Sequence, residues 1–118
     1  MTVTFGAAAV YIRLNTATGL ATTTSQVAGM GTNMLSLNTA DIDHDGDIDL
    51  ISASYNEGII SLARNNGNAT FATFTSSEGV NSQPRAAIAA DLDHDGGPEL
   101  IMALGALNVL GVRTLSCN

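Results

Sequence analysis

Two short stretches of this sequence concentrate carboxylates at alternating positions. DIDHDGDIDL (residues 41–50) holds five aspartates, and DLDHDGGPEL (residues 91–100) holds three aspartates and one glutamate. Carboxylates about 4 Å apart repel each other by roughly 1 kcal/mol even at the dielectric constant of water. A divalent cation reverses the sign of this interaction. The two stretches therefore indicate cation binding, and a merely solvated acidic turn is the alternative.

The spacing of the acids defines the kind of cation. They fall at positions 1, 3, 5 and 9 of a loop, and position 6 is glycine, which permits a sharp turn. Alternate side chains can then converge on one point, and the carbonyl of position 7 can add another oxygen. An irregular shell made only of oxygen favours Ca²⁺ over Mg²⁺. We expect two calcium sites, with ligands from Asp41, Asp43, Asp45, Asp47 (carbonyl) and Asp49 in the first loop and from Asp91, Asp93, Asp95, Gly97 (carbonyl) and Glu99 in the second.

An EF-hand loop begins in the same way but requires glutamate at position 12. Here that position is Ser52 in the first stretch and Met102 in the second, so the EF-hand interpretation is disfavoured. His44 and His94 occupy position 4 of the loops. We expect them to be solvent-facing spacers, with transition-metal binding or pH sensing as the alternative.

The acidic loops belong to a repeat of 50 residues. TADIDHDGDIDLISAS (39–54) aligns without gaps to AADLDHDGGPELIMAL (89–104). Alternation of apolar residues and the intervening turn signals predict a four-stranded antiparallel meander. Its predicted strands are residues 34–40, 49–54, 59–65 and 70–76.

A single four-stranded sheet cannot bury both of its faces. Four-stranded repeats of this length indicate an all-β fold built from the antiparallel blades of a β-propeller. We expect the second half of a blade at 1–33, with strands at 8–15 and 20–25, a complete blade with a calcium loop at 34–83, and the first part of a further blade with a calcium loop at 84–118. Propellers use about four to eight blades. A chain with about two blades is therefore either a fragment or is completed by other copies in a ring or filament.

The charge distribution limits the partners that we expect. The 118 residues carry 11 acids and 4 arginines, for a net charge of −7, and nine of the acids lie in the two loops. Without a basic patch, nucleic acid is not an expected partner. No apolar run reaches the roughly 18 residues of a membrane helix, so membrane insertion is not expected either. The arginines are expected to cap strand ends or to pair with loop carboxylates.

Three further features bear on export and on chemistry. FGAAAVYI (5–12) is a weak candidate for a signal-peptide core, because no positive region precedes it and Arg13 follows it directly. Asn68 begins an N-x-T sequon on a predicted turn and is a candidate glycosylation site. Cys117, the only cysteine, is expected to be a free thiol or to form an intermolecular bridge. We find no catalytic constellation and expect no enzymatic activity.

The pattern D-x-D-x-D-G-x-x-[DE]-L between apolar strands, followed by a turn, a strand, N-x-G and Phe, resembles the VCBS/FG-GAP repeat family. These repeats form the calcium-binding blades of integrin α-subunit-like propellers. The resemblance implies that each ion lies in the hairpin between the first two strands of a blade, held by the ligands named above. The second loop departs from the pattern, because it has GGPE where the first has GDID. We therefore expect the second loop to bind calcium more weakly.

The expected function is that of an extracellular or cell-surface structural and adhesive scaffold that carries two Ca²⁺ ions. Extracellular calcium modules bind at about 10⁻⁴ to 10⁻³ M, which suits the calcium concentration outside cells. The expected partner is another copy of the chain or the rest of a larger propeller. The alternatives are a lectin-like propeller domain that binds carbohydrate or protein, and a non-catalytic part of a larger secreted enzyme.

Overall fold

The computed structural model describes residues 2–3, 9–78 and 81–115, and every regular element within them is a β-strand. The strands are β1 (Thr2–Val3), β2 (Ala9–Ile12), β3 (Asn15–Thr16), β4 (Gly19–Leu20), β5 (Ser25–Ala28), β6 (Met34–Ala40), β7 (Asp49–Ser54), β8 (Ile59–Asn65), β9 (Phe71–Ser77), β10 (Pro84–Ala90), β11 (Glu99–Leu104) and β12 (Val109–Thr114). No helix long and apolar enough to cross a membrane occurs in these ranges.

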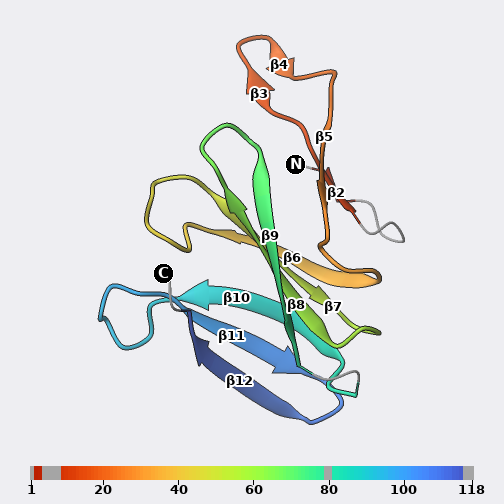
Figure 1. Cartoon of the computed structure of the whole chain (residues 1–118), viewed down its shortest axis with the longest axis vertical. Helices are drawn as coiled ribbons and strands as arrows, with labels where there is room; N and C mark the ends of the chain where they lie inside the picture. The colour runs from red at the N-terminus through yellow and green to blue at the C-terminus, as the bar shows by residue number, and fades with distance from the viewer. Residues whose placement is uncertain (1, 4–8, 79–80, 116–118) are drawn as a thin grey trace.

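Three antiparallel sheets follow one another along the chain, from orange through green to blue in Figure 1. We call them the N-terminal sheet (β1-β2-β5), the central sheet (β6-β7-β8-β9) and the C-terminal sheet (β10-β11-β12). A small hairpin, β3-β4, extends from the first of them. The predicted all-β class and the four-stranded antiparallel blade are confirmed, and no closed barrel forms within the described ranges.

The central sheet matches the predicted meander closely. Its first three strands have the predicted bounds, and the fourth begins at Phe71, one residue later than expected. All six residues of β7 are buried, which happens only when both faces of a strand are covered. The central sheet is therefore packed between two neighbours rather than exposed on one side.

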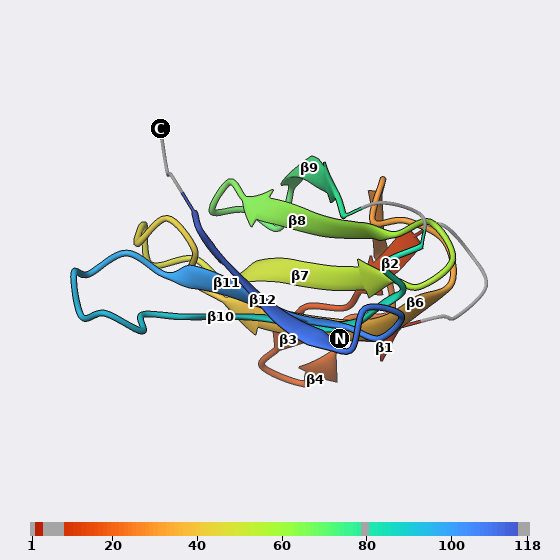
Figure 2. The same ribbon diagram turned by 90° about the horizontal axis from the view of Figure 1, so that it is seen from below.

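Each face of the central sheet meets one neighbouring sheet. The face that we call N-facing joins the N-terminal sheet in a cluster of Val10, Ile12, Val27, Met30, Met34, Leu50 and Ala63. The opposite, C-facing face joins the C-terminal sheet in a cluster of Ile42, Ile51, Ala53, Ile60, Ala87, Leu100, Met102 and Leu104. Strand β10 of the C-terminal sheet lies beside β6 and β7 at this interface, as can be followed in Figure 1 and Figure 2. Burial of these apolar side chains is the main term that holds the three sheets together.

The 50-residue repeat is also a structural repeat. Ala40 pairs with Asp49 in the central sheet, and Ala90 pairs with Glu99 in the C-terminal sheet. In the N-terminal sheet Val3 pairs with Val10. These residues lie 50 positions before Ala53 and Ile60, which pair with each other in the central sheet. The N-terminal sheet therefore contains a short counterpart of the second strand of a blade, in addition to the expected second half.

The strand predicted at 20–25 is wrong, and that predicted at 8–15 is too long. Residues 15–20 form the β3-β4 hairpin, and the strand that pairs with β2 lies at 25–28. The reason is burial: Leu20 is 59% exposed, whereas Val27 is 4% exposed and packs on the central sheet. The candidate signal-peptide core lies partly outside the described residues, and its Val10 and Ile12 belong to the core. Cys117 lies outside the described residues.

Candidate metal centres

The first acidic loop connects β6 to β7 and curls tightly. His44 and Gly46 have φ angles of 60° and 92°, and the second value lies in a region where a side chain is strained. The backbone N–H of Gly46 donates to Oδ2 of Asp41 at 3.1 Å, and that of Asp47 donates to Oδ1 of Asp45 at 2.8 Å. The carboxylates of Asp41 and Asp45 thus stabilise the curled loop by accepting hydrogen bonds from its backbone.

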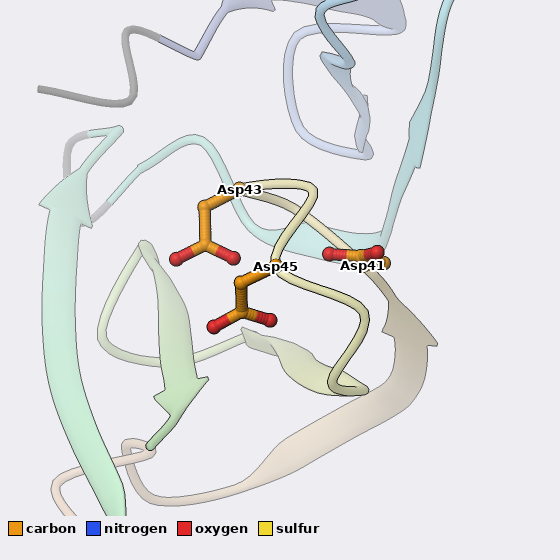
Figure 3. A group of neighbouring side chains, drawn as sticks. All are labelled: Asp41, Asp43 and Asp45. Atoms are coloured by element: carbon orange, nitrogen blue, oxygen red, sulfur yellow. The ribbon is translucent and has the colours of Figure 1, made fainter. Parts of the chain in front are cut away.

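Three of the predicted ligands come together in this loop. Asp41, Asp43 and Asp45 each offer a carboxylate oxygen within 4.8 Å of the others, as Figure 3 shows. Oxygens that bind Ca²⁺ lie about 2.3–2.6 Å from it, so oxygens up to about 5 Å apart can share one ion. Oδ1 of Asp41 and Oδ1 of Asp43 are buried without a hydrogen-bond partner among the described residues. Buried carboxylate oxygens are rarely left without a partner, so this donor set fits a hard cation.

Asp49, the predicted ligand at position 9, holds the loop closed. Its side chain is fully buried and lies outside the group of three carboxylates. Oδ2 accepts a hydrogen bond from the backbone N–H of Ile42, and Oδ1 accepts one from that of Asn65, both at 2.8 Å. One carboxylate therefore joins the start of the loop to the end of β8. Sequence reasoning missed this role, although the position of Asp49 at the start of an apolar strand signals burial.

Asp47 is half-buried, and its side chain lies near the β8-β9 turn. A Cβ placed on Gly67 would lie 3.0 Å from Oδ2 of Asp47. In the same turn, Oδ1 of Asn65 accepts hydrogen bonds from the backbone N–H groups of Gly67 and Ala69. The first loop is therefore supported along one side by the turn that carries the sequon.

The second loop, between β10 and β11, repeats this backbone. His94 and Gly96 have φ angles of 62° and 92°, and the N–H of Gly96 donates to Oδ2 of Asp91 at 3.2 Å. The N–H of Gly97 donates to Oδ1 of Asp95 at 2.8 Å. The two loops thus share one conformation despite the different residues at positions 7 to 9.

The carboxylates of the second loop are grouped differently. Here Asp91, Asp93 and Glu99 offer the oxygens that lie within 4.8 Å of one another, and Asp95 lies outside this group. Glu99 is 6% exposed, and its Oε2 accepts a hydrogen bond from the N–H of Leu92 at 2.8 Å. Asp91 and Asp93 are exposed, whereas Asp41 and Asp43 are half-buried. The second group is therefore the more hydrated of the two.

The contacts of the arginines agree in part with the expectation that they cap strand ends or pair with loop carboxylates. Nε of Arg64 lies 2.9 Å from Oδ2 of Asp43, which confirms pairing with a loop carboxylate. The Arg64 guanidinium also lies 5.8 Å from the centre of the Phe74 ring. Arg113 instead pairs with Glu78 at 3.1 Å, and Arg85 stacks on the Tyr55 ring. Among the described residues, Arg64 is thus the one arginine with an ion pair to a group of candidate ligands.

The remaining residues singled out in the sequence lie on the surface. His44 and His94 are exposed, as expected for spacers. Asn68 is exposed in the β8-β9 turn, and its Oδ1 accepts hydrogen bonds from the hydroxyl of Thr70 at 2.6 Å and from its N–H at 3.1 Å. The side chain of Asn68 is accessible, and its glycosylation stays a prediction.

Comparison with known proteins gives one match. The family model described as FG-GAP-like repeat matches residues 41–102, which is more than half of the chain. The match includes both acidic loops and the strands between them. No curated protein sequence and no solved structure matches significantly.

Proposed function

Because this chain belongs to the FG-GAP-like repeat family, we propose that it is a β-propeller repeat module whose two acidic loops each bind Ca²⁺. The observation that carries the proposal is the pair of buried, unpartnered oxygens on Asp41 and Asp43 inside a group of three carboxylates. A bound divalent ion satisfies these oxygens and removes the repulsion between the carboxylates.

The residues of the first loop have different roles in the proposed calcium site. Asp41, Asp43 and Asp45 would hold the ion, with the carbonyl of Asp47 as the further ligand expected from the spacing. Asp49, which the spacing also predicts as a ligand, instead closes the loop through its two backbone hydrogen bonds. Gly46 allows the curl at a φ angle of 92°. In the second loop, Asp91, Asp93 and Glu99 would hold the ion, with Asp95 and the carbonyl of Gly97 as further ligands.

We place the module outside the cell, as part of a structural or adhesive scaffold without catalytic activity. Extracellular calcium modules bind at about 10⁻⁴ to 10⁻³ M, so such sites fill outside the cell and stay empty in the cytosol. The grouped carboxylates are built into calcium loops, which leaves them poorly placed for acid-base chemistry. Calcium-dependent glycan arrays would test the lectin-like alternative, and reproducible binding of one glycan class would favour it.

Unfolding by denaturant tests the proposal. We compare the wild-type chain in millimolar Ca²⁺, in the same concentration of Mg²⁺ and in chelator, because a ligand that binds only the folded state stabilises it. At ten times the dissociation constant the gain is about 1.4 kcal/mol per site. The control is the double variant Asp43→Asn, Asp93→Asn, which should lose most of the gain. Equal unfolding midpoints in Ca²⁺ and in chelator would refute the proposal.

A further inference from the structure

The C-facing face of the central sheet shows what a covered blade face looks like in this protein. It includes Asn38, Ile51, Ala53, Ile60 and Leu62 of the strands, and Ile42 of the first acidic loop packs with them. Ile51, Ala53 and Ile60 are 0% exposed. The Nδ2 of Asn38 donates to the carbonyl of Ala87 in the C-terminal sheet at 2.8 Å. This face is an interface between two successive units of the 50-residue repeat.

The same face of the C-terminal sheet is uncovered. The residues 50 positions later are Ile88, Leu92, Ile101, Ala103, Leu110 and Val112. Leu92 is 52% exposed, Val112 57% and Leu110 74%, and Ile88 is 45% exposed. Within the described part of the chain no segment covers them, and a shallow hollow lies at one end, lined in part by Ala103 and Leu110. An apolar face of this extent, repeating an established interface, marks an interaction surface.

The interface already formed defines the chemistry of the surface that covers such a face. The C-terminal sheet covers the central sheet with Leu100, Met102 and Leu104. Arg113, from the same face of the sheet, reaches across to Glu78, with its Nη1 3.1 Å from Oε1. The covering surface is thus apolar at its centre and carries an arginine at its edge.

The N-terminal sheet presents the face that corresponds to this covering surface by the repeat register, and its described residues are more polar. Val10 and Ile12 of β2 pack against the central sheet, so Tyr11 between them faces the other side, and Arg13, the residue after the strand, is exposed. Gln26 lies opposite Tyr11 in the register, and Arg13 is exposed and makes no ion pair with any described residue. Arg13 stands 100 residues, or two repeats, before Arg113. The outward face of the N-terminal sheet is therefore the counterpart of the face with which the C-terminal sheet covers the central one.

We infer that a second copy of this chain places the Tyr11 and Arg13 face of its N-terminal sheet on the Leu92 and Leu110 face of the C-terminal sheet. The two faces lie at opposite ends of the row of sheets in Figure 1, so one copy cannot join them to each other. Contact between two different faces is head-to-tail and generates a ring or an open filament. The inference rests on the proposed function, because it extends the row of repeat blades.

Sedimentation of the full chain in saturating Ca²⁺ tests this interface. The weight-average mass of the wild type should rise with concentration, whereas Leu110→Asp and Arg13→Asp should each stay monomeric. A mixture of the two variants should form a 1:1 dimer and nothing larger, because each keeps one intact face. Both side chains are exposed, so folding should be unaffected, and Val112→Lys provides a second block on the same face. Leu35→Asp, at an exposed leucine of the central sheet, is the matched control and should assemble like the wild type.

Three results would overturn the inference. They are a wild-type chain that stays monomeric, a Leu110→Asp variant that still assembles, and a mixture of the variants that forms no dimer. Calcium binding is measured by calorimetry on the same samples. Calcium binding without assembly refutes this interface alone, and assembly without calcium binding refutes the proposed function alone.

Discussion

Arg64 supplies an internal cation to the first acidic loop, because its Nε lies 2.9 Å from Oδ2 of Asp43. Stacking near the Phe74 ring, at 5.8 Å, helps to hold the guanidinium there. The residue 50 positions later is Thr114, and no described arginine forms an ion pair with the second loop. The two loops of the repeat therefore differ in charge balance as well as in ligands.

Replacing Arg64 by glutamine should raise the calcium affinity of the first loop. The Arg64 side chain is 38% exposed, so its interaction with Asp43 is worth about 1 kcal/mol at most, or roughly a fivefold change in affinity. Calorimetric titration measures the calcium affinity of the first loop. It is carried out in an Asp93→Asn background, in which the second loop should no longer bind calcium. Arg13→Gln is the control and should leave the affinity unchanged. An unchanged or lower affinity for Arg64→Gln would show that the arginine does not compete with the ion.

Replacing Asp49 by asparagine should destabilise the fold even in chelator. The buried carboxylate accepts the N–H groups of Ile42 and Asn65, and an amide can present its oxygen to only one of them. A buried donor without a partner costs about 1–3 kcal/mol, so the free energy of unfolding should fall by about that amount. Asp45→Asn, at an exposed residue, should cost less than about 1 kcal/mol. Equal losses for the two variants in denaturant unfolding would contradict the structural role of Asp49.

Two paired serines of the central sheet should respond in opposite directions. Ser52 and Ser61 lie opposite each other in β7 and β8, and both are fully buried. The Ser52 hydroxyl donates to the carbonyl of Met30 at 2.8 Å, whereas the Ser61 hydroxyl has no hydrogen-bond partner among the described residues. Ser61→Ala should therefore raise the free energy of unfolding by up to about 1 kcal/mol, and Ser52→Ala should lower it by about 1 kcal/mol. Thermal unfolding of the two variants measures both changes. If Ser61→Ala lowered the free energy of unfolding, the Ser61 hydroxyl would make a stabilising hydrogen bond after all, and the prediction would be wrong.

The second loop should bind calcium more weakly than the first once Arg64 is replaced by glutamine. Its Asp91 and Asp93 are exposed and must give up more bound water, and Pro98 removes a backbone donor from the loop. Calorimetry of variants that keep one loop each ranks the two affinities. The changes Gly97→Asp, Pro98→Ile and Glu99→Asp give the second loop the residues of the first at positions 7 to 9 and should raise its calcium affinity toward that of the first loop. A second loop that binds calcium more tightly than the first in the Arg64→Gln background would contradict this ranking.

The repeat and its strands could be predicted because they depend on local patterns. Alternating apolar residues and the turn signals predict β6, β7 and β8 with the bounds that the structure has. The repetition of the loop sequence without gaps predicts that Ala40 pairs with Asp49 in the same register as Ala90 with Glu99. These features need no knowledge of distant contacts. The resemblance to the FG-GAP repeats rested on the same residues.

The remaining features depend on tertiary contacts that a local pattern does not contain. The N-terminal strand at 25–28 is selected by the burial of Val27 on the central sheet, not by the threonine-rich segment before it. The bond from Asn65 to Asp49 joins residues 16 positions apart, and the pairing of Arg64 with Asp43 joins residues 21 positions apart. Only the folded chain brings these groups together, and they decide which carboxylates remain free for an ion.

Calorimetric titration of the wild-type chain with Ca²⁺, beside the variant Asp41→Asn, Asp43→Asn, tests the central claim most directly. The account predicts two equivalents of bound calcium for the wild type and one for the variant, which keeps only the second group of Asp91, Asp93 and Glu99. No calcium binding by the wild type at millimolar concentrations, or equal stoichiometry in the two proteins, would contradict it.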